Sequence, residues 1–355
     1  MAIKDTLSLT IPASPIQYDV VFGEYLLKEV FVFLKSYPFR DLLITTTTIA
    51  KFLPDIQHHK IILQEELPIK SRGMKENIED LLIKKGYGRD TCLIAVGGGE
   101  LLDLIGFVAS TYCRGIPYIS IPTTLIAMTD ASIGGKTGVN LKDAKNWIGT
   151  FYHPMRVFID FSLLTTLPQQ EFVYGLAETI KHSLIADRDF FDFLELNYVD
   201  ILARDPLLIQ EMIRRSCLIK QSIVEKDPYE IKGLRQILNF GHSIGHALET
   251  FSNYTLAHGQ AVFIGMLVEA AIARRLGYLS SASYERIRRF FDKLPIRVDL
   301  PYDFPYQGLA VDKKGAYQFV VLRDLGLVVS SNGKYTADLT KEYLDLGWQD
   351  VMCSY

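Results

Sequence analysis

The chain has 355 residues, of which 48% are hydrophobic and 22% charged, and its formal net charge is −3. This composition is typical of a globular protein and excludes a disordered or fibrous chain. The small net charge and the lack of long lysine or arginine runs argue against a nucleic-acid-binding or anionic-membrane surface. Four cysteines without CxxC spacing predict free thiols. The N-terminus is unlike a secretory signal, which predicts a cytoplasmic protein. No apolar stretch approaches the roughly 18 residues of a membrane span.

The first half of the chain alternates β-rich runs with helical segments, which is typical of an open α/β sheet of Rossmann type. Strands are predicted at residues 42–45, 61–63, 92–96 and 118–121, and a helix from about 74 to 85. Continuous apolar runs such as 92–96 indicate parallel strands that helices cover on both faces. The length of the chain favours two domains. We expect the first, a Rossmann-like domain, at residues 1–168.

After about residue 168 the pattern changes to helical periodicity. Helices are predicted at residues 169–195, 206–226, 239–251 and 258–275, with a short hairpin near 318–330. We therefore expect a mostly α-helical second domain at residues 169–355, with the two domains closing on one cleft.

Three consecutive glycines, Gly97 to Gly99, follow a predicted buried strand and precede an apolar helix. Glycines at such a corner let the backbone approach a pyrophosphate, and the helix N-terminus adds positive potential. The turn departs from the GxGxxG fingerprint, and an ordinary strand–helix corner explains it equally well. Asp103 on the next helix is either a helix-start carboxylate or a cofactor contact.

A second glycine-rich segment, residues 130–140, surrounds Lys136 with small and hydroxyl side chains. Such a loop can wrap an anion, with the lysine as its counter-charge, and Lys145 and Asn146 offer a further cation and an amide. The alternative is a solvated surface loop. That alternative explains poorly why glycines and hydroxyls gather around a single lysine.

The second half contains a potential metal site. His242 and His246 lie at i and i+4, hence on one helix face, and His258 begins another apolar helix. A core histidine held by hydrogen bonds is the usual alternative, but three histidines so close together favour a metal. Catalytic zinc takes three N or O ligands and leaves one position open. Glu178 could be a carboxylate ligand, because a charged residue in an apolar stretch is either paired or coordinating.

An ordered set of motifs resembles the 3-dehydroquinate synthases, a family of sugar phosphate cyclases. The motifs run in order over residues 66–330 and are GGG(x)₃D(x)₂GF, TYxRG, IPTTLxAxxDxSxGGKTGxN, KNxIGxFYxP, GLAExIK, GLRxxLNFGHSxGHAxE and HG(x)AVxIGM. The resemblance implies an NAD-binding Rossmann-like domain, a helical metal- and substrate-binding domain and an active site in the cleft between them. It also implies a homodimer.

The resemblance implies roles for the matching positions. The metal, zinc with cobalt as the alternative, would be held by Glu178, His242 and His258. The substrate positions would be Asp130, Lys136, Lys145, Asn146, Lys181, Lys220, Arg235, Asn239, His246 and one of Lys313 and Lys314, with Arg114 reaching the phosphate from the neighbouring subunit. The NAD positions would be Glu66 with Lys70, Gly98, Gly99, Asp103, Thr123, Thr124, Thr165, Thr166 and Glu171.

The implied activity is that of a carbon–oxygen lyase of the shikimate pathway, which leads to the aromatic amino acids. The substrate would be a small-molecule sugar phosphate, 3-deoxy-D-arabino-heptulosonate 7-phosphate, and the products 3-dehydroquinate and phosphate. The reaction would proceed by transient oxidation with NAD, phosphate elimination, re-reduction and an intramolecular aldol closure.

Three substitutions depart from the family pattern. Leu102 replaces a motif glycine, Thr46 replaces a carboxylate that would hold ribose hydroxyls, and Gln260 replaces a glutamate next to His258. Because an amide still accepts and donates hydrogen bonds, Gln260 is expected to tune metal affinity rather than abolish it. One residue is also inserted between Lys220 and Arg235.

Three further functions remain open. A sugar phosphate cyclase acting on sedoheptulose 7-phosphate or glucose 6-phosphate is the nearest, although this chain keeps Arg235, Asn239 and the Asp-Lys-Lys of residues 312–314. A metal-dependent alcohol or glycerol dehydrogenase shares the two-domain plan but needs no phosphate cradle. A non-catalytic paralogue is suggested only by the departures at positions 46, 102 and 260.

Overall fold

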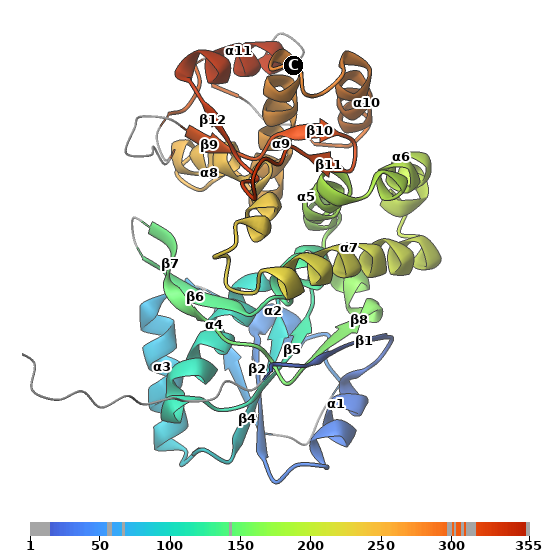
Figure 1. Cartoon of the computed structure of the whole chain (residues 1–355). Helices are drawn as coiled ribbons and strands as arrows, with labels where there is room; N and C mark the ends of the chain where they lie inside the picture. Colours follow the sequence, from blue (N-terminus) through green and yellow to red (C-terminus); the bar gives the residue numbers. More distant parts are fainter. Residues whose placement is uncertain are drawn as a thin grey trace, which may run out of the picture.

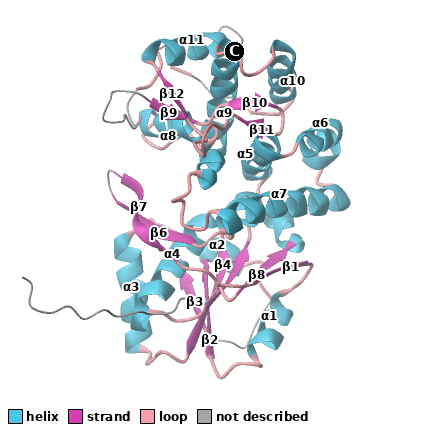
Figure 2. Ribbon diagram, in the orientation of Figure 1, coloured by secondary structure: helices cyan, strands magenta, loops and turns pink. Residues whose placement is uncertain are grey.

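Six parallel strands form the central sheet of the first half of the chain (Figures 1 and 2). The computed structural model describes residues 15–54, 59–65, 68–141, 144–296, 300–301, 303–306, 309 and 317–352. The strand order is β1-β8-β5-β4-β2-β3. The strands are β1 (Asp19–Gly23), β2 (Arg40–Thr46), β3 (Lys60–Leu63), β4 (Thr91–Gly97), β5 (Tyr118–Pro122) and β8 (Arg156–Asp160). Because all the pairings are parallel, the carboxyl ends of the strands lie at one edge of the sheet.

Helices cover both faces of this sheet. On one face α1 (Leu27–Leu34) packs on Leu43 and its neighbours, and on the other α3 (Arg72–Lys84) and α4 (Gly99–Thr111) pack on Leu42 and Ile44. Successive residues of β2 thus enter opposite cores, as the alternation of side chains in a strand requires. The short α2 (Thr47–Ala50) follows β2, and η1 (Tyr112–Arg114) follows α4.

An antiparallel hairpin projects from the first half toward the second. It consists of β6 (Lys136–Leu141) and β7 (Ala144–Phe151), and the π-helical turn η2 (Ala127–Ala131) precedes it. In Figure 1 the end of β7 lies below α8. The two strands approach so closely at Gly149 that a Cβ there would lie 1.9 Å from the carbonyl oxygen of Thr137.

The second half is mostly helical and is built around a buried helix, α9 (His258–Arg275). The remaining helices are α5 (Gln169–Ala186), α6 (Arg188–Leu202), α7 (Pro206–Lys226), η4 (Leu234–Asn239), α8 (His242–Phe251), α10 (Ser281–Asp292) and α11 (Lys341–Met352). Helices α5, α8, α10 and α11 pack against α9. At the contact of α8 with α9, a Cβ on Gly265 would lie 1.9 Å from the carbonyl oxygen of Gly241, so the two backbones touch.

Two small strand pairs lie beside these helices. One pairs β9 (Tyr317–Phe319) with β12 (Ala337–Leu339), and the other pairs β10 (Leu322–Asp324) with β11 (Leu327–Val328). The turn η3 (Phe161–Thr166) connects β8 to α5. None of the described helices is long and apolar enough to cross a membrane.

The predicted class, a Rossmann-like sheet followed by a helical domain, is confirmed. The strands at 42–45, 61–63, 92–96 and 118–121 and the helices at 74–85, 206–226 and 258–275 are also found, within a few residues. Cys92 and Cys217 are buried free thiols, as expected, whereas Cys113 is only partly buried.

Several predicted boundaries are wrong. The helix predicted at 169–195 is two helices, because Asp187 is extended and its carboxylate accepts a hydrogen bond from the backbone N–H of Phe190 (2.9 Å), which begins α6. The helix predicted from 239 begins at His242, after Gly241 in a left-handed conformation. The hairpin predicted near 318–330 is limited to β10 and β11, since β9 pairs with β12 instead. The segment 130–140, expected to be a loop, includes the strand β6.

Candidate active site

Three residues from three helices form a group suited to a metal ion. Glu178 lies within α5, and His242 and His258 are the first residues of α8 and α9. Glu178 Oε1 lies 3.3 Å from His242 Nε2 and 3.4 Å from His258 Nε2. The three ligand atoms all lie within 4.8 Å of one another. One carboxylate and two imidazoles are the donor set of a catalytic zinc site with an open position, so these residues fit the metal.

The charge of Glu178 is balanced within the protein. Its second carboxylate oxygen forms an ion pair with Lys181, one turn further along α5, and both side chains are 1% exposed. Burial alone would raise the pKa of Glu178, but Lys181 and His242 hold it well below its usual range. Burial, reinforced by Lys181, lowers the pKa of His242. An ionised carboxylate and a neutral imidazole are the protonation states that bind a cation.

His246 lies beside the metal group rather than within it. It is exposed on α8, and its ring centroid lies 5.6 Å from that of His242 and 6.1 Å from that of His258. His246 also belongs to a second group of possible ligands, with Glu249 and His258.

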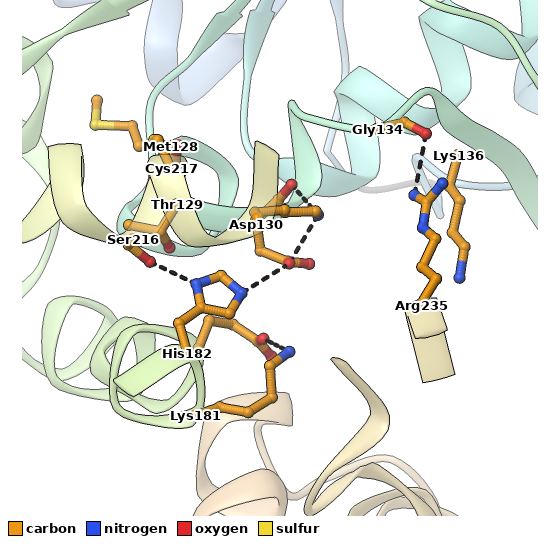
Figure 3. Close-up of polar contacts among 12 residues, drawn as sticks. Met128, Thr129, Asp130, Gly134, Lys136, Lys181, His182, Ser216, Cys217 and Arg235 are labelled. Carbon is orange, nitrogen blue, oxygen red and sulfur yellow. Dashed lines mark hydrogen bonds and ion pairs between the residues drawn. The ribbon is translucent and has the colours of Figure 1, made fainter. Parts of the chain in front are cut away.

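A buried polar network surrounds Asp130, which lies in η2 (Figure 3). Lys220 Nζ from α7 lies 2.7 Å from Asp130 Oδ1, and His182 Nε2 from α5 lies 3.5 Å from the same oxygen. His182 Nδ1 lies 2.6 Å from Ser216 Oγ, so the ring stands between Ser216 and Asp130. Burial would raise the pKa of Asp130, but Lys220 and Lys181 hold it well below its usual range. Asp130 is therefore a charged acceptor at neutral pH.

Arg235 and Lys136 lie on the other side of Gly134 from this network. The Arg235 side chain is buried, and its guanidinium donates to the carbonyl oxygens of Gly134 (3.0 Å, Figure 3) and Pro228 (2.6 Å). Lys136 is 53% exposed, and its Nζ lies 2.5 Å from Glu230 Oε2. The proposed anion cradle thus holds a lysine that is paired with a carboxylate but open to solvent.

The β6–β7 hairpin connects the two halves of the site. Lys145 Nζ on β7 lies 3.2 Å from Glu249 Oε1 on α8. The neighbouring Asn146 accepts a hydrogen bond from Lys70 Nζ through Oδ1 (2.5 Å), and Lys70 also lies 2.6 Å from Asp103 Oδ2. Burial raises the pKa of Asp103, and Lys70 only partly opposes this.

The carboxyl edge of the sheet carries the positions expected to contact NAD. Gly98 precedes α4 and Gly99 is its first residue, while the N–H of Thr123 donates to the carbonyl oxygen of Gly97 (3.0 Å). A Cβ on Gly99 would lie 3.1 Å from Ala131 Cβ, a tight contact, so this turn has little room for side chains. The buried hydroxyl of Thr123 has no partner within the described part of the chain. Free N–H groups at a helix start and an unpaired hydroxyl fit a dinucleotide pyrophosphate.

A carboxylate is present at this edge even though position 46 is a threonine. Glu65, just after β3, accepts hydrogen bonds from Thr47 Oγ1 (3.0 Å) and from the hydroxyl and N–H of Thr48 (2.5 and 3.2 Å). At the start of α9, Gln260 Oε1 accepts from the N–H of Ala257 (3.2 Å). Gln260 thus caps the helix that begins with His258. Leu102, the third departure, is buried in the packing of α4.

The remaining expected site residues lie apart from these contacts. Thr165 and Thr166 donate their hydroxyl hydrogen bonds within η3, to the carbonyl oxygens of Ser162 and Leu163 (both 2.7 Å). Residues with exposed side chains are Glu171 in the first turn of α5, Asn239 at the end of η4, and Arg114, whose φ is +67°. Glu66, Lys313 and Lys314 lie outside the described residues.

The sequence interpretation misses four residues that support this site. They are His182 beside Asp130, Glu230 beside Lys136, Glu249 beside His258, and the buried Glu269, which accepts from the N–H of Gly241 (2.7 Å). His182 carries a usable signal, since it lies at i+4 from Glu178 on the same helix. The other three are brought in by tertiary packing.

Comparison with known proteins finds the same family over most of the chain. A family model described as 3-dehydroquinate synthase N-terminal matches residues 60–174, and one described as 3-dehydroquinate synthase C-terminal matches residues 175–315. The 3-dehydroquinate synthase of Nitrosomonas europaea is 41% identical over 327 residues, which cover 87% of this chain and 88% of the relative. The 3-dehydroquinate synthase of Sulfurisphaera tokodaii is 47% identical over 242 residues, 66% of this chain and 69% of the relative.

Solved structures resemble the chain over almost its whole length. A 2-epi-5-epi-valiolone synthase from Streptomyces hygroscopicus, with NAD⁺ and Zn²⁺ bound, has a TM-score of 0.85 at 27% identity and covers 98% of this chain and 100% of its own. A 2-deoxy-scyllo-inosose synthase complexed with carbaglucose-6-phosphate, NAD⁺ and Co²⁺ shares the fold, with a TM-score of 0.80 at 24% identity and coverage of 93% and 96%. A probable glycerol dehydrogenase from Sinorhizobium meliloti is more distant, with a TM-score of 0.62 at 16% identity and coverage of 79% and 82%.

Proposed function

The chain belongs to the 3-dehydroquinate synthase family, and we propose that it converts 3-deoxy-D-arabino-heptulosonate 7-phosphate to 3-dehydroquinate and phosphate. The observation that carries the proposal is the convergence of a glycine-rich strand edge, a Glu-His-His group and several cations where the two halves of the chain meet. We place the domain boundary at residues 168/169, between η3 and α5. The proposed class is a carbon–oxygen lyase that depends on NAD and a divalent metal.

The residues present fit both cofactors. Glu178, His242 and His258 would hold zinc or cobalt, and the carboxyl edge with Gly98, Gly99 and its threonines would hold NAD. When bound, the metal would supply polarisation of a substrate hydroxyl and NAD would supply a reversible hydride acceptor, the chemistry needed to acidify the neighbouring carbon before phosphate leaves.

The cations of the site serve to bind and orient an anionic substrate. Lys136 and Lys145 are 53% and 38% exposed, and each is paired with a carboxylate, Glu230 or Glu249. A phosphate or carboxylate of the substrate can accept charge-assisted hydrogen bonds from these lysines. Each ammonium group has three donors, so it can contact the substrate while it stays paired with its carboxylate.

Asp130 would position the hydroxyls of the substrate. Lys220 and His182 hold its carboxylate in a fixed orientation, and its low pKa keeps it an acceptor at neutral pH. A carboxylate fixed from two sides loses little entropy when a hydroxyl binds to it, and this fixed geometry is the means by which a site selects one orientation of a sugar.

The decisive experiment measures phosphate release from the purified protein with NAD and zinc. The substrates are the heptulosonate 7-phosphate, sedoheptulose 7-phosphate and glucose 6-phosphate, each offered separately. We expect release from the heptulosonate alone, followed by the appearance of 3-dehydroquinate. Release from sedoheptulose 7-phosphate alone would instead support the second candidate function, an epi-valiolone synthase, which the structural likeness at a TM-score of 0.85 favours.

A homodimer is proposed from Arg114. This arginine is exposed, in a left-handed conformation next to Cys113, which is also left-handed. Backbone strain at a non-glycine residue is retained where the side chain has a use. We expect a dimer in light scattering, and we expect inactive Arg114→Ala and Lys220→Met proteins to regain activity when refolded together. A monomer with full activity contradicts the assignment.

A further inference from the structure

We propose that Glu249 is a positioning residue, which orients His258 for the metal by accepting a hydrogen bond from its Nδ1. The inference rests on the proposed function in one respect, that His258 is a metal ligand. Glu249 is the last residue of the motif GLRxxLNFGHSxGHAxE, but the motif assigns it no role; its place beside the ligand is visible only in the fold.

The two nitrogens of the His258 ring face two different carboxylates. Nε2 lies 3.4 Å from Glu178 Oε1, the same oxygen that faces His242 Nε2, so Nε2 is the atom on the metal side. Nδ1 lies 3.4 Å from Glu249 Oε1, on the outer side of the ring. A ring that binds a metal through Nε2 carries its proton on Nδ1 and needs an acceptor there. Glu249 is placed to accept it.

Glu249 is itself held in place. Its side chain is 4% exposed, and its Oε1 also lies 3.2 Å from Lys145 Nζ of the β6–β7 hairpin. The ring of Tyr254 lies 4.3 Å from Lys145 Nζ, and the N–H of Tyr254 donates to the carbonyl oxygen of Glu249 (2.7 Å). The carboxylate is thus fixed by a cation from the other half of the chain, and that cation is fixed by an aromatic face. A carboxylate fixed in this way orients the imidazole more strongly than a mobile one.

Two alternative roles of Glu249 predict different results. Glu249 could itself bind the metal, in the second group with His246 and His258. Alternatively, its only role could be the ion pair with Lys145 that connects the two halves. The first role makes Glu249 more important for metal binding than Glu178, and the second makes Lys145 as important as Glu249.

The test measures zinc affinity of the metal-free full chain by competition with a chromophoric chelator, without substrate. We expect Glu249→Gln to bind zinc about 10-fold more weakly than the wild type, because a neutral amide is a weaker acceptor than a carboxylate and changes to such a partner cost about 10- to 100-fold in metal affinity. Glu178→Gln should lose more than Glu249→Gln, because it removes a ligand. Glu249→Asp, which keeps the charge but shortens the reach, should fall between the wild type and Glu249→Gln, and it keeps the test decisive if the Gln variant does not fold.

Two further variants separate these roles. Lys145→Met should weaken zinc binding less than Glu249→Gln does, because Glu249 then loses one support but still lies beside His258. Glu195→Gln removes a partly buried glutamate that pairs with Arg286 far from the site, and should leave zinc affinity unchanged. Three outcomes would each overturn the inference. Glu249→Gln could bind zinc as tightly as the wild type, Glu249→Gln could lose more zinc affinity than Glu178→Gln, or Lys145→Met could lose as much as Glu249→Gln. If the wild type binds no zinc, the proposed metal dependence fails first, so the two failures are distinguishable.

Discussion

The two halves of the chain contribute different kinds of chemical group to the site. In the first half the cofactor edge consists of backbone and small side chains, and a Cβ on Gly98 or Gly99 would lie 3.2 or 3.1 Å from a neighbouring side chain. In the second half the site consists largely of charges that are neutralised, such as the buried pair of Glu178 with Lys181, and Lys220, which pairs with Asp130 of the first half. One part is specified by shape and the other by charge balance.

This difference predicts which substitutions each half tolerates. A turn with such tight side-chain contacts tolerates a change of charge nearby better than an added carbon atom. A buried ion network tolerates small changes of shape but not the loss of one charge, because the remaining partner is left buried without compensation. Substitutions in each half therefore test whether this difference between the halves holds.

Removal of a metal ligand should have the largest effect. We expect His258→Ala to lose the metal and to lower kcat by about 1000-fold, because polarisation by a metal contributes several kcal/mol to the transition state. Bound zinc is measured by elemental analysis and turnover by phosphate release. His59→Ala, at an exposed histidine before β3, is the matched control and should retain both. An active, metal-free His258→Ala protein would refute the ligand assignment.

Removal of one buried charge should cost stability. Lys220 is 6% exposed and compensates Asp130, so Lys220→Met should lower the free energy of unfolding by about 3 kcal/mol. Chemical denaturation at neutral pH measures the loss. The double variant Lys220→Met with Asp130→Asn should recover part of it, because no uncompensated charge remains. If the double variant is less stable than the single one, charge balance does not explain this part of the site.

The sequence predicts the parts of the molecule that have a periodic or contiguous signal. Residues 92–96 form an unbroken apolar run that predicts a strand, and the ordered motifs bring Glu178, His242 and His258 together. The strand β1 has no such signal because it is short and only partly buried, and β6 has none because its glycines and polar residues resemble a loop.

Contacts between distant residues are not predictable from the sequence for a physical reason. The pairing of Lys136 with Glu230, and of Glu249 with both Lys145 and His258, depends on how the hairpin and the helices pack. A single glutamate on a helix has the same local pattern whether it faces solvent or a ligand. Only the tertiary structure separates the two cases.

The exposed lysine of the proposed cradle should affect substrate but not cofactor. We expect Lys136→Ala to raise the KM for the phosphorylated substrate by about 10-fold or more, since a hydrogen bond to a charged group contributes about 1.5–3 kcal/mol. The Kd for NAD, measured by calorimetry, should not change. Lys334→Ala, at another exposed lysine with a carboxylate partner, is the control. Equal losses of substrate and NAD affinity would argue against a separate anion cradle.

An added carbon atom should weaken only the cofactor edge. In Gly99→Ala the new Cβ meets Ala131 Cβ at 3.1 Å, and we expect the Kd for NAD to rise by about 10-fold, since overpacking costs about 1–3 kcal/mol. Zinc affinity should stay at the wild-type value. Gly73→Ala in α3, where a Cβ meets nothing within 4 Å, should change neither. A loss of zinc with unchanged NAD affinity would reverse the comparison between the two halves.

The smallest expected effect is a change in stability with pH at Glu269, which accepts a hydrogen bond from the N–H of Gly241 just before α8. Burial raises the pKa of this carboxyl well above its usual range, and the N–H of Gly241 only partly opposes the rise. A carboxyl with a raised folded-state pKa stabilises the fold fully below its unfolded pKa of about 4.3, and this stabilisation is lost as the pH rises through the folded-state pKa. Glu269→Gln keeps an acceptor for Gly241 and cannot ionise.

We therefore expect the metal-free wild type and Glu269→Gln to be similarly stable near pH 5, and the variant to be more stable by about 1 kcal/mol at pH 8. Thermal unfolding in the presence of a chelator measures the difference. Glu269→Ala removes the cap of α8 and should be less stable than Glu269→Gln at every pH, by about 1 kcal/mol. A stability difference between wild type and Glu269→Gln that does not change with pH would show that Glu269 stays ionised. A buried ionised Glu269 would then face no cation among its described contacts, and charge balance would not describe the interior of the helical domain.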